Sequence, residues 1–198
     1  MSLKNTATEW GWLSKLFHWL IVLLILGQGS LGLWMVTLRN SPDKIQLYAL
    51  HKSFGLSILA LALLRLTWRL YSGVPRPVPG IPRWQKRAAD LSHWGLYALL
   101  FAIPISGWVL NSAAGFPLQW FGLFNLPPIA GKDEGLHELA EQVHELLFWT
   151  LVGVAIVHAA AAFYHHLFKR DATLARMLPR GWLRAEQSPD PIEDSPNA

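Results

Sequence analysis

Eight histidines are the residues of this chain best suited to chemistry, because its 198 residues include no cysteine. Without a thiol there can be no disulfide, no thiolate metal site, no thiol nucleophile and no covalently attached c-type haem. Imidazole is the commonest metal ligand in proteins, and two axial imidazoles are one way to hold a b-type haem. Five histidines lie within or at the margin of long apolar stretches: His18, His51, His93, His144 and His158. A polar side chain inside a bilayer is costly, so each of them is a functional hypothesis.

The spacing of His144 and His158 is the strongest single feature. Their spacing of fourteen positions turns a helix to within about 40° of four full turns, so both rings share one face. The rise is about 21 Å, most of a hydrocarbon core of about 30 Å. Two ligands at opposite depths suit two stacked cofactors better than one shared ion. Matching depths predict an outer pair of His51 with His144 and an inner pair of His18 with His158, the four metal ligands.

Arg65 repeats the same spacing, because it follows His51 by fourteen residues. An arginine at that depth needs an anion, and a haem propionate near the inner face would supply one with bidentate geometry. The alternative is a cation that snorkels to the inner surface. Gly55 lies one turn after His51, and it could leave space for a flat macrocycle together with Gly27, Gly29, Gly32 and Ala159 to Ala162. Small residues also serve plain helix packing.

The remaining histidines leave alternatives open. For any one membrane histidine, the ordinary interpretation is a hydrogen-bonded residue inside the bundle. His93 lies near the inner pair, where it could hydrogen-bond a propionate or a quinone, or replace His18 as a ligand. We expect His165 and His166 to be interfacial and His137 to fall in a loop. The inner pair has one difficulty: His18 is three residues from Lys15, whereas His158 is eleven from Lys169.

Four apolar stretches carry these residues, at about 16–36, 47–70, 91–110 and 143–168. Each is near the roughly 20 residues that a spanning helix needs. Charged residues make up 15% of the chain, against about 25% in a typical soluble domain. The first stretch is longer than a secretory signal's apolar region of about 7–15 residues. The sequence therefore predicts an all-α bundle of four transmembrane helices in one membrane domain, residues 1–185.

The basic residues predict the orientation of this bundle. With the N-terminus inside, thirteen of the 17 lysines and arginines fall on the inner side: Lys4, Lys15, Arg65, Arg69, Arg76, Arg83, Lys86, Arg87, Lys169, Arg170, Arg176, Arg180 and Arg184. Both termini are then expected to be cytoplasmic. The net charge of +4 needs no nucleic-acid partner to explain it, because the basic residues follow the membrane.

Three connecting segments have a recognisable character. The inner loop 72–82 is rich in proline and cannot be helical. The outer segment 113–128 has too few apolar residues to span, and we expect an interfacial or re-entrant lid with its Trp and Phe at the lipid headgroups. The tail 186–198 is acidic and rich in Pro and Ser, so it should be disordered.

Residues 10–180 resemble the bacterial cytochrome b561 family, four-helix di-haem b proteins of the inner membrane. That family is related to the cytochrome b subunits of nickel hydrogenases and formate dehydrogenases. The motifs that carry the resemblance are His18-Trp19, the H-x-S-x-G of His51 to Gly55, Arg65, the stretch HWGLYALLFAIPISGW from His93, the histidine pair of the fourth helix, and the run HAAAAFYHHLFKRDATLARMLP. The acidic tail is not part of the pattern.

The resemblance implies two b-type haems with bis-histidine ligation and electron transfer to the quinone pool of the bacterial inner membrane. One member of the family suggests a sharper activity, in which superoxide is oxidised at the outer face and electrons reach ubiquinone. Lys52 and Lys132 could attract superoxide, although Glu138, Glu141 and Glu145 weaken that interpretation. His93 and Arg69 are the candidates for a quinone site.

Two other functions remain open. The chain could be an electron-relay and anchor subunit of a periplasmic dehydrogenase or hydrogenase, with no substrate of its own. A histidine-lined metal or proton transporter would use Asp or Glu within the helices. The acidic residues here lie at the helix margins, which disfavours it.

Overall fold

The computed structural model describes residues 2–179 and 182–183. Its elements are α1 (Trp12–Thr37), α2 (Pro42–Ser72), α3 (Arg83–Ala113), β1 (Leu118–Trp120), β2 (Phe124–Leu126), α4 (Glu134–Leu167) and a short 3-10 helix (Ala175–Met177). All four α-helices are long and apolar enough to cross a membrane. The predicted fold class, a helical bundle with four membrane spans, is confirmed. The predicted tail 186–198 and the boundary at 185 lie outside the described residues.

Capping explains why α2 and α4 begin before the apolar stretches do. Ser41 caps α2 by accepting a hydrogen bond from the Lys44 backbone N–H at 3.2 Å, and Pro42 follows as the first helical residue. Asp133 caps α4 by accepting from the Leu136 N–H at 2.7 Å. Because the first turns of α4 carry charged residues, the apolar stretch predicted from hydropathy begins at about residue 143, whereas the helix begins at Glu134. His137, predicted to lie in a loop, is therefore in the first turns of α4.

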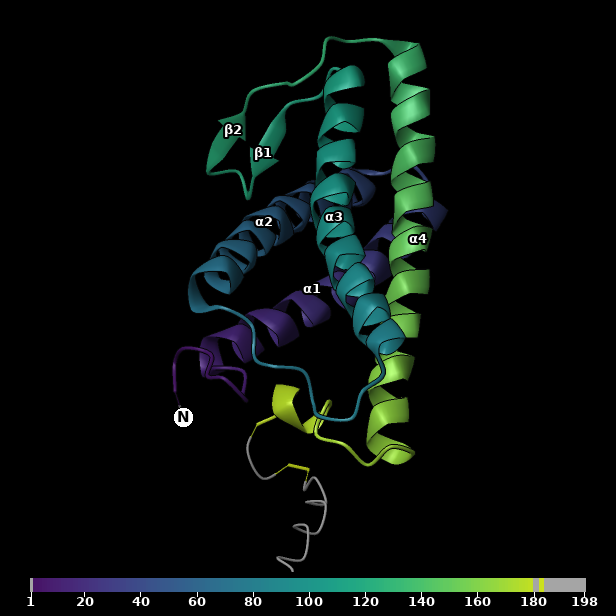
Figure 1. Ribbon diagram of the computed structural model, residues 1–198. Coiled ribbons are helices and arrows are strands. Elements are labelled where there is room, and N and C mark those ends of the chain that lie inside the picture. The colour runs from purple at the N-terminus through teal and green to yellow at the C-terminus, as the bar shows by residue number, and fades with distance from the viewer. Residues whose placement is uncertain (1, 180–181, 184–198) are drawn as a thin grey trace, which may run out of the picture.

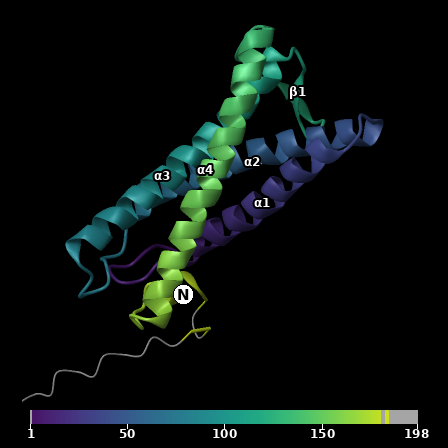
Figure 2. The same ribbon diagram turned by 90° about the vertical axis from the view of Figure 1, so that its right-hand side faces the viewer.

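The helices pack in chain order, α1 on α2, α2 on α3 and α3 on α4. In Figure 1, α1 and α2 run together and cross the upright pair α3 and α4, and in Figure 2 α4 lies in front of the other helices. A buried cluster of Ile21, Ile58, Ala62 and Leu100 joins the first three helices. Among the described residues, α4 has no comparable backbone packing against α1 or α2. Side chains must therefore bridge the space between α4 and that pair.

The outer segment between α3 and α4 forms a two-stranded antiparallel hairpin, in which Leu118 pairs with Leu126. Strands of three residues are too short to leave a periodic pattern, so only a lid of unspecified structure was predicted here. The hairpin docks on α2: Trp120 Nε1 donates to Ser57 Oγ at 3.0 Å and the Phe121 N–H donates to Ser53 Oγ at 2.9 Å. Its exposed residues include Phe116, Phe121, Leu123 and Phe124, a composition that suits a membrane interface.

Three segments meet at the opposite end of the bundle. Residues 73–82 are not helical, as predicted, whereas Ser72, which the predicted loop included, is the last residue of α2. The Arg76 N–H donates to Ala7 O at 2.8 Å. Lys15 Nζ donates to Leu178 O at 2.7 Å, and Trp19 Nε1 donates to Met177 O at 2.9 Å. The N-terminal segment and the chain that follows α4 therefore lie at the same end of the molecule (Figure 1).

Candidate functional site

Both histidine pairs expected from the sequence are close together in space. The ring centroids of His51 and His144 are 6.3 Å apart, with an interplanar angle of 73°. Those of His18 and His158 are 6.4 Å apart, with an angle of 68°. One ring of each pair comes from α4 and the other from α1 or α2. The imidazoles thus reach across the space that the helix backbones leave open.

These separations fit one metal ion between two imidazoles. A metal–imidazole bond is about 2.0–2.1 Å long and a ring nitrogen lies about 1.15 Å from its centroid, so two opposed ligands place their centroids about 6.3–6.5 Å apart. Both pairs fall within or at the edge of this range. In the described part of the chain, no three His, Cys, Asp or Glu residues form a cluster that could hold a metal ion. Two opposed imidazoles per site suit a haem iron, whose other four ligands belong to the macrocycle.

His93 also approaches His158, but at a different distance. Their ring centroids are 5.4 Å apart, with an interplanar angle of 68°. This is about 1 Å less than two opposed metal ligands require. Of the two candidate partners for His158, His18 lies at the distance expected when two imidazoles bind one metal ion. His93 lies at the distance of a direct edge-to-face contact between the two rings.

Ser106 on α3 fixes the hydrogen position of His144. The Ser106 hydroxyl donates to Ile103 O at 2.8 Å, and its oxygen lies 2.9 Å from His144 Nδ1. Because the hydroxyl proton is already used, Nδ1 must donate, and Nε2 then keeps a free lone pair. A metal-binding histidine in proteins is usually oriented in this way. Gly107 leaves room for the ring, since a Cβ there would lie 3.2 Å from His144 Cε1.

The surroundings of His51 come from α1. Gln28 Nε2 donates to the backbone carbonyl of His51 at 2.5 Å. A Cβ on Gly32 would lie 3.1 Å from His51 Cε1, so only glycine leaves the ring its present position without a shift. Within the described residues, His51 Nδ1 is buried and has no hydrogen-bond partner. No hydrogen bond to Nδ1 therefore competes with a ligand for this imidazole.

Arg65 and His18 are directly joined at the inner pair. Arg65 Nη2 donates to His18 Nδ1 at 3.2 Å, and its guanidinium lies 5.4 Å from the centroid of the Tyr97 ring. Arginine can only donate, so in this arrangement Nδ1 of His18 accepts and Nε2 carries the proton. If Nε2 of His18 bound a metal, the proton would move to Nδ1 and Arg65 would lose this acceptor. The guanidinium would then be available to an anion.

The depth difficulty at the inner pair is resolved by the helix ends. Lys15 reaches Leu178, eleven residues beyond the last residue of α4, Leu167. The start of α1 therefore lies at the same depth as the segment that follows α4. His18 thus lies beside His158, although the two histidines are separated from the nearest lysine by different numbers of residues.

The glycines differ in part from the expectation. Gly55 faces Gln28, whose Nε2 would be 3.5 Å from an added Cβ, and not a histidine. The glycines that face the outer rings are Gly32 and Gly107. Sequence reasoning missed Gly107, Ser106 and Gln28. Their roles depend on which helices become neighbours, and the Ser-Gly dipeptide before Trp108 was the only available signal.

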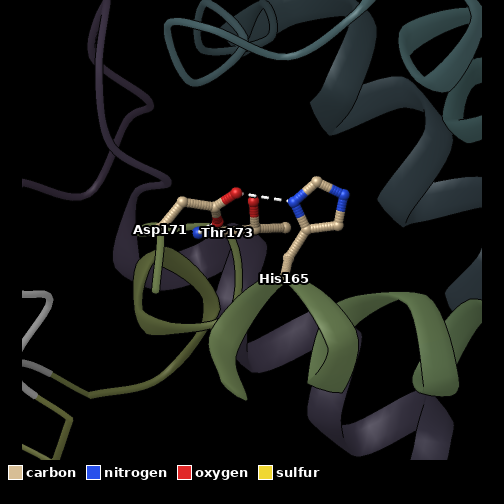
Figure 3. A network of polar contacts seen from close by, with 3 residues as sticks. All are labelled: His165, Asp171 and Thr173. Carbon is tan, nitrogen blue, oxygen red and sulfur yellow. Dashed lines mark hydrogen bonds and ion pairs between the residues drawn. The ribbon is translucent and has the colours of Figure 1, made fainter. Parts of the chain in front are cut away.

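The last turn of α4 carries a separate polar network (Figure 3). His165 Nδ1 donates to Asp171 Oδ2 at 2.5 Å, and the Thr173 N–H donates to Asp171 Oδ1 at 2.8 Å. Burial alone would raise the pKa of the Asp171 carboxyl, but hydrogen bonds from Thr173 and His165 outweigh it and the pKa lies below its usual value. His165 thus fastens the chain after α4 and is not placed as a member of a histidine pair.

Lys52 supplies a cation beside the outer pair. Its Nζ donates to Asn111 Oδ1 at 3.0 Å and approaches Pro117 O at 3.5 Å. Both acceptors are neutral. The side chain is partly buried and follows His51 directly in the sequence, so a positive charge lies near the outer end of the site.

Four membrane-length helices with paired histidines between them are the arrangement of a membrane-bound b-type cytochrome. Residues 9–180 match the family model described as prokaryotic cytochrome b561. The chain therefore belongs to the prokaryotic cytochrome b561 family. This membership implies b-type haem, a transmembrane location and a role in electron transport, as the motifs suggested.

Similar proteins support this assignment over most of their length. Cytochrome b561 homolog 2 of Escherichia coli is 36% identical over 185 residues, which cover 90% of this chain and 95% of the relative. Cytochrome b561 homolog 1 of the same organism is 30% identical and covers 82% and 93%. A protein of Yersinia pestis named a probable superoxide oxidase is 31% identical and covers 82% and 92%.

Proposed function

We propose that this chain carries two b-type haems and transfers electrons across the bacterial inner membrane. His51 and His144 would be the axial ligands of the outer haem, and His18 and His158 those of the inner one. The observation that carries the proposal is the spacing of the two imidazole pairs, 6.3 and 6.4 Å, which suits one iron between each pair.

Other residues would support these ligands. Gly32 and Gly107 leave room for the rings of the outer pair, while Ser106 orients His144. Gly55, one turn after His51, would leave space for the macrocycle. Arg65 would pair with an inner propionate once His18 no longer accepts its hydrogen bond. His93, too close to His158 for an intervening metal, would be a hydrogen-bonding neighbour of the inner haem.

Bound haem would supply the one-electron chemistry, and the protein would supply placement and charge. The proposed reaction oxidises two superoxide ions to two molecules of oxygen at the outer face. The two electrons, with two protons, reduce one ubiquinone to ubiquinol. Lys52 would attract the anionic donor toward the outer pair. The relative named a probable superoxide oxidase supports this choice of donor.

The test is superoxide-driven reduction of a short-chain ubiquinone by the purified, haem-loaded protein. We expect ubiquinol to form at half the rate of superoxide consumption, and superoxide dismutase to abolish it. A fall in rate with rising ionic strength is expected, because the attraction between Lys52 and superoxide is screened by salt.

The contrary result would be a protein with both haems that superoxide does not reduce. That outcome would favour the electron-relay and anchor subunit of a larger periplasmic dehydrogenase or hydrogenase complex. His93→Ala separates the two assignments of the inner ligand. We expect it to keep the inner haem and His18→Ala to lose it, and the reverse result would assign His93.

A further inference from the structure

The two histidines of the outer pair differ in what holds them. His144 Nδ1 lies 2.9 Å from Ser106 Oγ. His51 Nδ1 is buried without a hydrogen-bond partner among the described residues. One ring of the outer pair is therefore oriented by a hydrogen bond and the other is not.

The direction of the proton follows from the contacts of Ser106. Its hydroxyl donates to Ile103 O at 2.8 Å, one turn back on α3. A hydroxyl has a single proton, so the oxygen can only accept from His144. The neighbouring Gly107 faces Cε1 of the same ring. One turn of α3 thus selects the tautomer of His144 and limits rotation of its ring.

We propose that Ser106 is a positioning residue that tunes the electron affinity of the outer haem. The inference rests on the proposed function, in which His144 is an axial ligand. When the Nδ1–H of a ligand imidazole donates a hydrogen bond, the Nε2 that binds the metal is more basic than in an imidazole without that bond. A more basic axial ligand stabilises the oxidised iron, so Ser106 makes the outer haem harder to reduce.

The test is a redox titration of the haem-loaded protein with Ser106→Ala. We expect both haems to remain and the reduction equilibrium constant of the outer haem to rise about three- to tenfold, about 30–60 mV for one electron. Ser106→Thr keeps the hydroxyl and should restore the original value. The low-temperature EPR signal of the outer ferric haem should change with Ser106→Ala, because the ring is freed to rotate.

Thr150→Ala is the matched control. The Thr150 hydroxyl donates to Leu146 O at 2.8 Å on an exposed face of α4, so the change removes a similar hydroxyl away from His144. It should leave both potentials unchanged. Equal shifts in the two variants, or equal shifts of both haems with Ser106→Ala, would overturn the proposal.

If the Ser106→Ala protein does not retain the outer haem, the variant to use is Ser106→Cys, in which a thiol of similar size is a weaker acceptor than the hydroxyl. We then expect the potential of the outer haem to rise by less than the shift expected for Ser106→Ala, and an unchanged potential would overturn the proposal. A wild-type protein without an outer haem would instead contradict the proposed function. The two failures are therefore distinguishable.

Discussion

At the residue scale, Arg65 is the charge closest to the inner pair. Its guanidinium is partly buried, hydrogen-bonds to His18 and lies over Tyr97, and no carboxylate is among these contacts. A positive charge in such surroundings stabilises the reduced form of a nearby haem and so raises its reduction potential. It also needs an anion, which a propionate would provide.

We predict that Arg65→Gln lowers the potential of the inner haem by about 60 mV, a tenfold change in its reduction equilibrium constant. The outer haem should be unaffected, because Arg65 follows His51 by fourteen residues, about 21 Å along α2. Arg65→Lys should recover part of the shift, since it keeps the charge without the fork geometry. An unchanged inner potential in a redox titration of Arg65→Gln would refute this role.

At the element scale, Gly107 lets α3 approach the ring that α4 presents. We predict that Gly107→Ala weakens binding of the outer haem about tenfold, because the new Cβ would be 3.2 Å from His144 Cε1 and the ring must move. Haem titration of the apoprotein measures the effect. Gly153→Ala is the control, since Gly153 is exposed and a Cβ there meets nothing within 4 Å. Equal affinities for the two variants would contradict the prediction.

Asp171 fastens the chain after α4 to the last turn of that helix. Its pKa is lowered in the folded protein, so the stabilisation is complete above its ordinary pKa of about 3.9 and is lost as pH falls through the lower folded value. We predict that Asp171→Asn lowers the free energy of unfolding at pH 7 by about 1 kcal/mol, or Tm by about 2–4 °C.

Thermal unfolding of Asp171→Asn between pH 7 and pH 3 checks this sign. The difference from wild type should shrink toward the acid end, because the wild-type carboxyl begins to be protonated as pH approaches its lowered pKa. Glu141→Gln, which removes an exposed carboxylate from the same helix, should show no such trend. A difference that is constant with pH would mean that the charge of Asp171 does not matter.

The elements show which parts of the fold a sequence can reveal. The four helices were predictable because hydropathy reports a spanning segment directly, and the approach of His18 to His158 followed from helical spacing and depth. The hairpin was not, because its short strands are held by contacts to Ser53 and Ser57 of another helix. Ser106 and Gly107 were missed for the same reason. Their function exists only once α3 lies against α4.

At the scale of the whole molecule, the orientation in the membrane follows from charge. The three segments that meet at one end, together with the helix ends beside them, carry most of the lysines and arginines, and we predict that this end is cytoplasmic. A reporter that is active only in the cytoplasm should be active when it is fused after residue 198. A reporter that is active only in the periplasm should be active when it is inserted near Gly131. The reverse pattern would place the outer and inner pairs on the wrong sides.

The two histidine pairs also predict how haem is distributed over the molecule. Each pair joins α4 to a different helix, so each should bind independently of the other. His51→Ala should remove only the outer haem and His18→Ala only the inner one. The two single variants should therefore retain complementary halves of the wild-type spectrum.

The most direct test is the haem content of the purified protein, measured with its reduced-minus-oxidised spectrum. We predict two six-coordinate b-type haems per chain in the wild type and one in each of these variants. A wild-type protein with a single haem, or variants that keep both, would show that the 6.3 and 6.4 Å imidazole pairs are not the ligand sets.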